Sequence, residues 1–206
     1  MAGRPCPVGS RTIRFLASSH QLHQLAPRTL VLTFLLLVGL AGQAVTGVLM
    51  HHQRAGWTPT AIAAYYRGRS IDPATLGPVE LDKALAGDPG YTDVPPKTWE
   101  ALLDVAHMHL AWMPLLVFLA AHLFAMTPLG RGLLGAILGY GTLVAAILDI
   151  VTPFLVRYHH AIWAWAKLGA FLGLETGMLL MIVLTLGSGI SIAIRRRKEA
   201  HQTASC

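Results

Sequence analysis

The sequence has few charged residues, and this scarcity excludes most classes of soluble protein. Only 13% of its 206 residues are charged, whereas 54% are hydrophobic and the mean hydropathy is +0.54. Soluble domains carry about 25% charged residues. A chain this apolar would expose too much hydrophobic surface in water, so soluble cytoplasmic enzymes and nucleic-acid-binding domains are excluded. The net charge of +6 does not restore a nucleic-acid partner, because the basic residues lie at segment ends.

Cysteine is nearly absent as well. Cys6 and Cys206 lie near opposite ends of the chain, which excludes a disulfide scaffold. There is no C-x-x-C-H motif for covalent haem attachment and no C-x-x-C pair for zinc or redox chemistry. With a single loop of appreciable size, the sequence also leaves no room for a separate catalytic domain.

Long apolar segments are what the sequence has instead. A transmembrane helix needs about 20 mainly apolar residues, and we expect four such helices at about 30–50, 105–126, 133–155 and 161–194. The predicted fold is therefore all-α, an integral membrane bundle of four transmembrane helices within 30–194. Its surroundings are the lipid bilayer.

Three segments lie outside the predicted helices. Residues 1–29 form a basic segment, in which 11–25 fits an amphipathic helix on the membrane surface. Residues 195–206 form a basic tail. The loop 51–104 separates the first two spans.

Two threonines predict helix starts around this loop. Thr58 precedes Pro59, which suits the first position of a short helix. Thr98 is expected to cap the helix that enters the membrane. The prolines between them predict irregular chain.

The distribution of basic residues predicts the orientation. The two tails and the short turn 127–132 hold nine of the sixteen Lys and Arg residues with a single acid, whereas the 51–104 loop has five basic and seven acidic residues. By the positive-inside rule, both termini face the cytoplasm. We expect a multi-pass protein of a bacterial inner membrane, with the large loop on the outer side.

Histidines are the residues that most clearly indicate a functional site in this sequence. Ten are present, and six of them fall at the outer ends of three predicted spans: His51, His52, His107, His109, His159 and His160. Ionisable residues at membrane depth are costly and usually functional. Neutral imidazole is also a common metal ligand. A single such histidine is more often solvated or hydrogen-bonded, but three pairs at one level predict a metal or cofactor site.

The spacing of the histidines narrows the choice of metal. HH, HMH and HH do not match the longer histidine boxes of membrane di-iron enzymes, and Glu-x-x-His and H-E-x-x-H are absent. Copper remains an alternative, since Met50, Met108 and Met113 lie near the histidines; iron or zinc would use the same six side chains. Haem b needs two axial imidazoles and apolar walls, for which Trp99, Trp112, Trp163 and Trp165 are candidates, although an aromatic belt at the interface explains them equally well.

His122 extends the haem interpretation. It follows His107 by fifteen residues on one predicted helix, which places it about 22 Å deeper and about 60° around the helix. Through AHMHLAWMPLLVFLAAH (residues 106–122) and its four spans, the chain resembles the four-helix membrane cytochromes b, in which two histidines on one face hold two stacked haems. A second haem at His122 would need a partner, and only His20 or His23 in the N-terminal segment is available at that depth. We therefore expect one haem, with His122 more often a hydrogen-bonding residue.

A second resemblance concerns the loop and its exit. The stretches AYYRG and PKTWEALLDVAHMH are similar to those of small, uncharacterised bacterial four-span membrane proteins. This resemblance implies the fold and little about activity.

Three charged residues lie inside the predicted spans. Glu175 lies near the middle of the fourth span, where a lone carboxylate is expensive, so it must be protonated or paired. Lys167 is about 80° away around the same helix, which makes a direct pair doubtful. Asp149, near the outer end of the third span, is a candidate to orient a histidine together with Arg54 or Arg157. Glu175 and Asp149 are candidate proton-relay residues.

The sequence thus predicts a haem-b electron-transfer protein working between a membrane quinone and a redox partner on the outer side. His107 or His109 and His159 or His160 are the expected axial ligands, and Arg54 and Arg157 the expected propionate partners. The alternatives are a copper, iron or zinc site built from the histidines, and a cofactor-free accessory subunit of a larger membrane complex.

Overall fold

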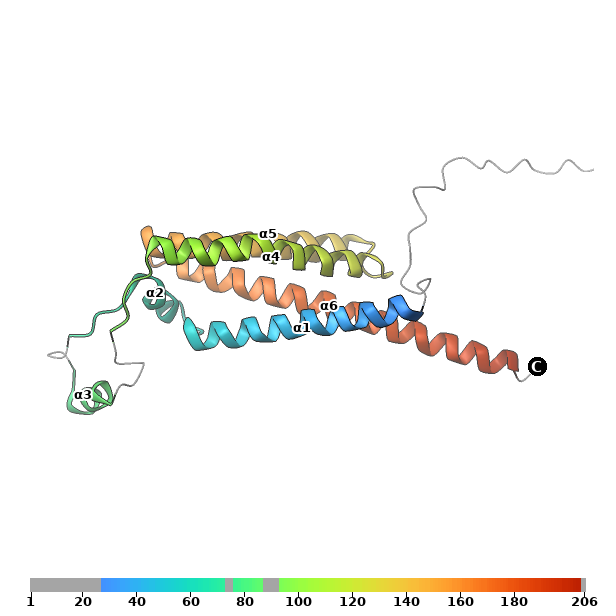
Figure 1. Cartoon of the computed structure of the whole chain (residues 1–206), viewed down its shortest axis with the longest axis horizontal. Coiled ribbons are helices and arrows are strands. Elements are labelled where there is room, and N and C mark those ends of the chain that lie inside the picture. Colours follow the sequence, from blue (N-terminus) through green and yellow to red (C-terminus); the bar gives the residue numbers. More distant parts are fainter. Residues whose placement is uncertain (1–26, 73–75, 87–92, 205–206) are drawn as a thin grey trace, which may run out of the picture.

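Four long helices dominate the structure, a computed structural model that describes residues 27–72, 76–86 and 93–204. The long helices are α1 (Pro27–Arg54), α4 (Trp99–Ala125), α5 (Leu133–Tyr158) and α6 (Trp163–Ala204). The short helices α2 (Pro59–Arg67) and α3 (Pro78–Leu85) follow α1 in the chain and precede α4, and they lie at one end of the bundle (Figure 1). All four long helices are long and apolar enough to cross a membrane. The predicted four-span, all-α fold is confirmed.

The surface of the bundle suits a bilayer. Large hydrophobic side chains are exposed along all four long helices, among them Phe34, Phe118, Ile147 and Val183. The placement of both termini in the cytoplasm stays a prediction. The amphipathic segment 11–25, with His20 and His23, lies outside the described residues.

The helix starts around the loop follow the expected local chemistry. The Thr58 side chain accepts a hydrogen bond from the Ala61 N–H at 3.1 Å, with Pro59 in the first turn. Thr98 accepts one from the Ala101 N–H at 3.2 Å. Both predicted helix starts are confirmed, and so is the cap at Thr98; each threonine oxygen satisfies an N–H that the first helical turn leaves free. The short helix α3 was not expected.

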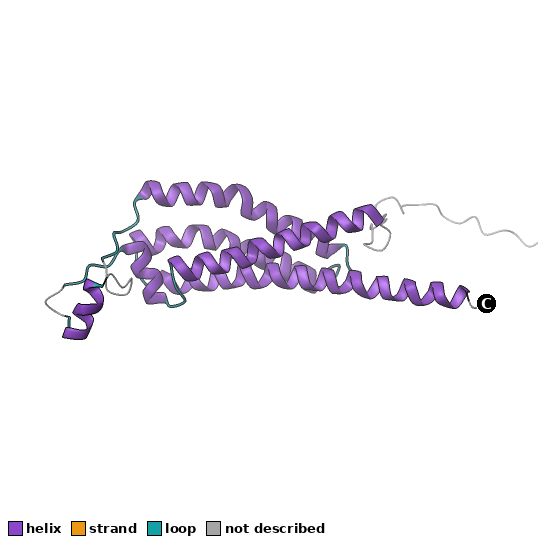
Figure 2. Ribbon diagram, turned by 60° about the horizontal axis from the view of Figure 1, so that its bottom comes forward, coloured by secondary structure: helices purple, strands orange, loops and turns teal. Residues whose placement is uncertain are grey.

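The long helices pack unequally. α5 and α6 form the closest pair, α4 packs against α5, and α1 packs mainly against α6 and has few contacts with α4. Figure 2 shows that α6, which leads to the marked C-terminal end, extends beyond the other helices. A Cβ on Gly177 would collide with Thr142 Oγ1, so glycine at this position permits the close approach of α6 to α5. The small residue at this position in α6 therefore serves close packing.

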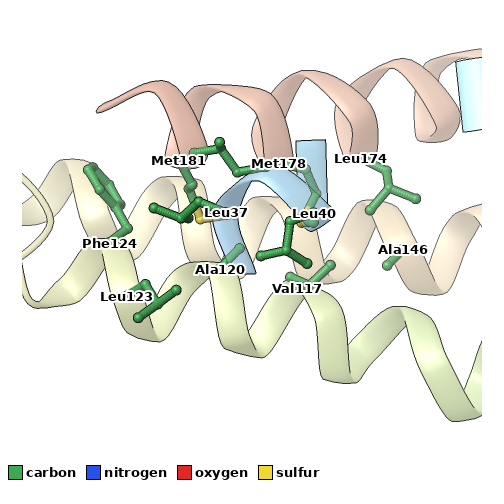
Figure 3. Packing of buried hydrophobic residues seen from close by; sticks show 11 residues of the cluster. Leu37, Leu40, Val117, Ala120, Leu123, Phe124, Ala146, Leu174, Met178 and Met181 are labelled. Carbon is green, nitrogen blue, oxygen red and sulfur yellow. The ribbon is translucent and has the colours of Figure 1, made fainter. Parts of the chain in front are cut away.

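The hydrophobic core lies in the half of the bundle far from α2. Side chains from all four long helices meet there, including Leu37, Val117, Ala146 and Met181 (Figure 3). A second, smaller cluster holds α2 against the bundle, with Ile62 fully buried beside Val156 and Ala164. Between these two clusters the helices leave space.

Candidate functional site

A cavity of about 500 Å³ lies between the long helices on the side of the bundle near α2. This volume is within the range of about 300–1,000 Å³ that small-molecule and cofactor sites occupy. On α4 its lining runs from Ala101 to Val117, which is about 24 Å along a helix. The cavity is therefore elongated along the bundle, and its two ends carry different side chains.

His51 of α1 has a buried ring nitrogen without a hydrogen-bond partner among the described residues. The residue is 9% exposed, it lines the cavity, and its Nε2 atom has no hydrogen-bond partner among the described residues. The imidazole stacks on the Phe171 ring at a centroid distance of 3.9 Å and an interplanar angle of 10°, and Trp57 lies 5.4 Å away. Because a buried polar atom without a partner is costly, Nε2 has the features of a ligand atom.

His109 of α4 lines the same cavity. Its Nδ1 lies 2.7 Å from the carbonyl oxygen of Val105, one turn earlier in the helix. A carbonyl can only accept, so Nδ1 carries the proton and donates, which leaves the lone pair on Nε2. Metal-binding histidines are commonly oriented in this way, by a hydrogen bond from the other ring nitrogen.

The other candidate histidines lie elsewhere. His52, His107, His122, His159 and His160 are all exposed, and none lines the cavity. His160 Nδ1 accepts a hydrogen bond from the Ile162 N–H at 3.1 Å, and His122 stacks on Phe118 at 5.9 Å. The structure thus brings His109 to the same cavity as His51, and not to the His159–His160 pair that the sequence suggested.

An ion pair that the sequence reasoning missed forms one wall. Lys167 of α6 pairs with Asp149 of α5, and the two side chains are 7% and 5% exposed. Lys167 Nζ also donates to the Asp149 carbonyl oxygen at 3.1 Å. Pro153 lies four residues after Asp149 within α5 and has no N–H to donate to that carbonyl. Lys167 therefore neutralises the carboxylate and replaces the missing helical hydrogen bond.

Glu175 lines the same cavity at the end that lies farther from α2. It is partly buried, and no hydrogen bond joins its carboxyl group to any other residue that the structure describes. A Cβ on Gly47 would lie 2.5 Å from Glu175 Oε1. The carboxyl group therefore rests directly against the backbone of α1 at Gly47, and a Cβ at this position would displace it.

Cationic side chains line the end near α2. Arg54 lines the cavity, as expected of a propionate partner, and so does Lys97. The Lys97 ammonium lies 4.4 Å from the centre of the Tyr65 ring. Arg157 does not line the cavity; its Nε donates to the Lys97 carbonyl oxygen at 2.9 Å. Sequence reasoning missed Lys97 as a residue of the cavity. The sequence signal for it was its position directly before Thr98, the predicted helix cap.

Aromatic residues of α2 complete this end. Tyr65 and Tyr66 line the cavity, and burial, with a smaller contribution from the Asp149 charge, raises the pKa of the Tyr66 hydroxyl above its ordinary value. Tyr66 therefore stays a neutral hydrogen-bonding group. The four tryptophans expected as walls are exposed: Trp99, Trp112, Trp163 and Trp165.

A metal centre built only from side chains would need several ligands together. Within 27–72, 76–86 and 93–204, no group of three or more His, Cys, Asp or Glu side chains is arranged to hold a metal ion. Met50 and Met113 line the cavity, whereas Met108 does not. The cavity offers two imidazoles that a planar cofactor could use.

Comparison with known proteins identifies a family for the membrane-spanning part of the chain. No curated protein and no solved structure matches it significantly. A family model described as a transmembrane helical domain matches residues 56–199, which contain α2 to α5 and most of α6. The match begins two residues after α1 ends. Because it covers more than half of the chain, the protein belongs to this transmembrane helical domain family, Aq_1264_TM.

Proposed function

We propose that the protein is a membrane electron-transfer protein that would hold one haem b in this cavity, with His51 and His109 as the residues that would bind its iron. The observation that carries the proposal is the meeting of two imidazoles from different helices at one cavity, each with a ring nitrogen available. Haem supplies a one-electron carrier when bound, and the protein tunes it through its ligands and surroundings.

The residues around the two histidines suit this role. The Val105 carbonyl fixes the His109 ring, and the stacked Phe171 ring fixes His51, so neither imidazole needs to reorient on binding. Arg54 and Lys97 line the cavity near α2, where their charges would complement haem propionates. The apolar remainder of the lining excludes water.

The expected partners follow from this location. A quinone dissolved in the membrane and a redox partner on the outer side would exchange electrons through the protein, in a bacterial inner membrane. A copper, iron or zinc site and a cofactor-free accessory subunit remain the alternative functions, and the following experiment separates them.

The test is the haem content of the protein purified in detergent. We expect about one haem per chain and the sharp reduced bands of a six-coordinate b haem. His51→Ala and His109→Ala should each lose most of the haem, whereas the control variants His107→Ala and His159→Ala, at exposed positions, should keep it. Full haem in both His51→Ala and His109→Ala would refute the ligand assignment.

Two further outcomes of the same measurement are informative. Two haems per chain would require His122 as a ligand. Stoichiometric metal without porphyrin would refute the haem proposal in favour of a metal site, and a featureless spectrum without metal would favour the accessory subunit.

A further inference from the structure

The end of the cavity far from α2 differs from the end that contains His51. Gln43 lies eight residues before His51 on α1, about 12 Å deeper along the helix. Gln43, Gly47 and Glu175 contribute to this deeper end. Opposite them, α4 contributes only apolar side chains, Met113, Leu116 and Val117. We call this part of the cavity the deep pocket.

The cavity opens sideways between α1 and α4. These two helices form facing walls but make few contacts with each other. Gln43 and Thr46 on α1 and Val105 on α4 all line the cavity and are all exposed. Since these positions lie within segments that cross the membrane, the opening faces lipid. A ligand that enters here comes from the bilayer.

The polar groups of the deep pocket define the head group of such a ligand. Neither the Gln43 amide nor the Glu175 carboxyl group hydrogen-bonds to another described residue. Polar groups at this depth are costly unless they find a partner. In its ionised form the carboxylate would repel an anionic lipid head, and in its protonated form it donates to carbonyl oxygens, as the amide N–H does.

We propose that the deep pocket binds the head group of a lipid-soluble quinone that enters between α1 and α4, with Gln43 and Glu175 hydrogen-bonding to its carbonyl oxygens. The apolar side chains of α4 cover the ring, and the isoprenoid tail extends through the opening into lipid. This inference rests on the proposed function for its purpose, since it places the quinone next to the haem site. Quinone binding itself is measurable without haem.

The structure provides a matched pair of variants for the test. Gly47→Ala would place a methyl group 2.5 Å from the present position of Glu175 Oε1 and so displace the carboxyl group. Gly39→Ala, on the same helix, would meet no atom within 4 Å. Both changes add one methyl group to α1, but only the first alters the deep pocket.

The experiment is equilibrium binding of a decyl-substituted benzoquinone to the protein in lipid nanodiscs. We expect saturable binding in the unchanged protein and in Gly39→Ala, with binding at least about tenfold weaker in Gly47→Ala and in Glu175→Leu, as the loss of a strong hydrogen bond predicts. Equal affinity in all four proteins, or no saturable binding, would overturn the proposal.

Two arms distinguish the ligand and the two proposals. Competition with a diacylglycerol tests a neutral lipid as the occupant; if it displaces the quinone at equal concentration, the pocket is not a quinone site. Haem content is measured on the same samples. If His51→Ala loses haem but Gly47→Ala binds quinone as tightly as the unchanged protein, the quinone site alone is refuted. If Gly47→Ala binds quinone more weakly but the unchanged protein never holds haem, the haem proposal alone is refuted.

Discussion

Replacing Lys167 by methionine should destabilise the bundle strongly, because it leaves the Asp149 carboxylate alone in a buried position. The two side chains are 7% and 5% exposed. Removing one partner of a buried ion pair costs about 3–5 kcal/mol. The Asp149 carbonyl, which Pro153 leaves without a helical donor, would lose the Lys167 hydrogen bond at the same time.

The double variant Lys167→Met/Asp149→Leu should be much less damaging than the sum of the single variants. It removes both charges and their desolvation cost, so the ion pair itself contributes little net change. The unpaired backbone carbonyl remains and costs about 1–3 kcal/mol. We therefore expect a destabilisation of about 1–3 kcal/mol for the double variant.

Unfolding in mixed detergent micelles, followed by far-UV circular dichroism, measures these free energies. Asp104→Asn is the control, since Asp104 is an exposed acid of α4 and its neutralisation should change the stability by less than about 0.5 kcal/mol. A cost below about 1 kcal/mol for Lys167→Met, or strict additivity of the single changes, would refute the structural role assigned to the pair.

Two further predictions concern the turn of α2 and the α5–α6 contact. Burial raises the pKa of Tyr66 above its ordinary value of 10, so the folded protein favours the neutral phenol; its stability should be complete below pH 10 and fall as the pH rises further and the unfolded chain ionises. Thermal unfolding should show this loss of stability at alkaline pH in the unchanged protein and in Tyr140→Phe, a control at an exposed position. The loss should be smaller in Tyr66→Phe. An identical loss in Tyr66→Phe would contradict the assignment of this pH dependence to Tyr66. Gly177→Ala would place a methyl group against Thr142 Oγ1 and should cost about 1–3 kcal/mol by overpacking, measured by the same unfolding assay, with Gly169→Ala, which meets no atom within 4 Å, as the unaffected control.

The features that the sequence predicted correctly are local ones. Four spans follow from four apolar runs, and the helix starts at Thr58 and Thr98 follow from side chains that cap their own helices. The helix α3 was missed because its residues contribute no buried side chain, so no hydrophobic periodicity marks it.

The candidate site was predictable only in part, because it depends on which helices face each other. His109 and Arg54 were named and line the cavity. His51 was also named, as a candidate metal ligand, but its meeting with His109 at one cavity depends on the placement and rotation of α1, which no local pattern reveals. The Lys167–Asp149 pair did leave a signal: the residues lie eight and ten positions from His159 at the turn between α5 and α6, and opposite charges at similar distances from such a turn meet in an antiparallel hairpin.

The loose attachment of α1 gives the cavity a compliant wall. Three sides of the cavity belong to α4, α5 and α6, and α5 packs closely against both α4 and α6. In contrast, α1 is held mainly by α6. A small tilt of α1 changes the width of the cavity without repacking the other three helices. For the proposed haem site, such a tilt would adapt the cavity to the thickness of the cofactor, while the buried Lys167–Asp149 pair ties α6 to α5 on the opposite wall.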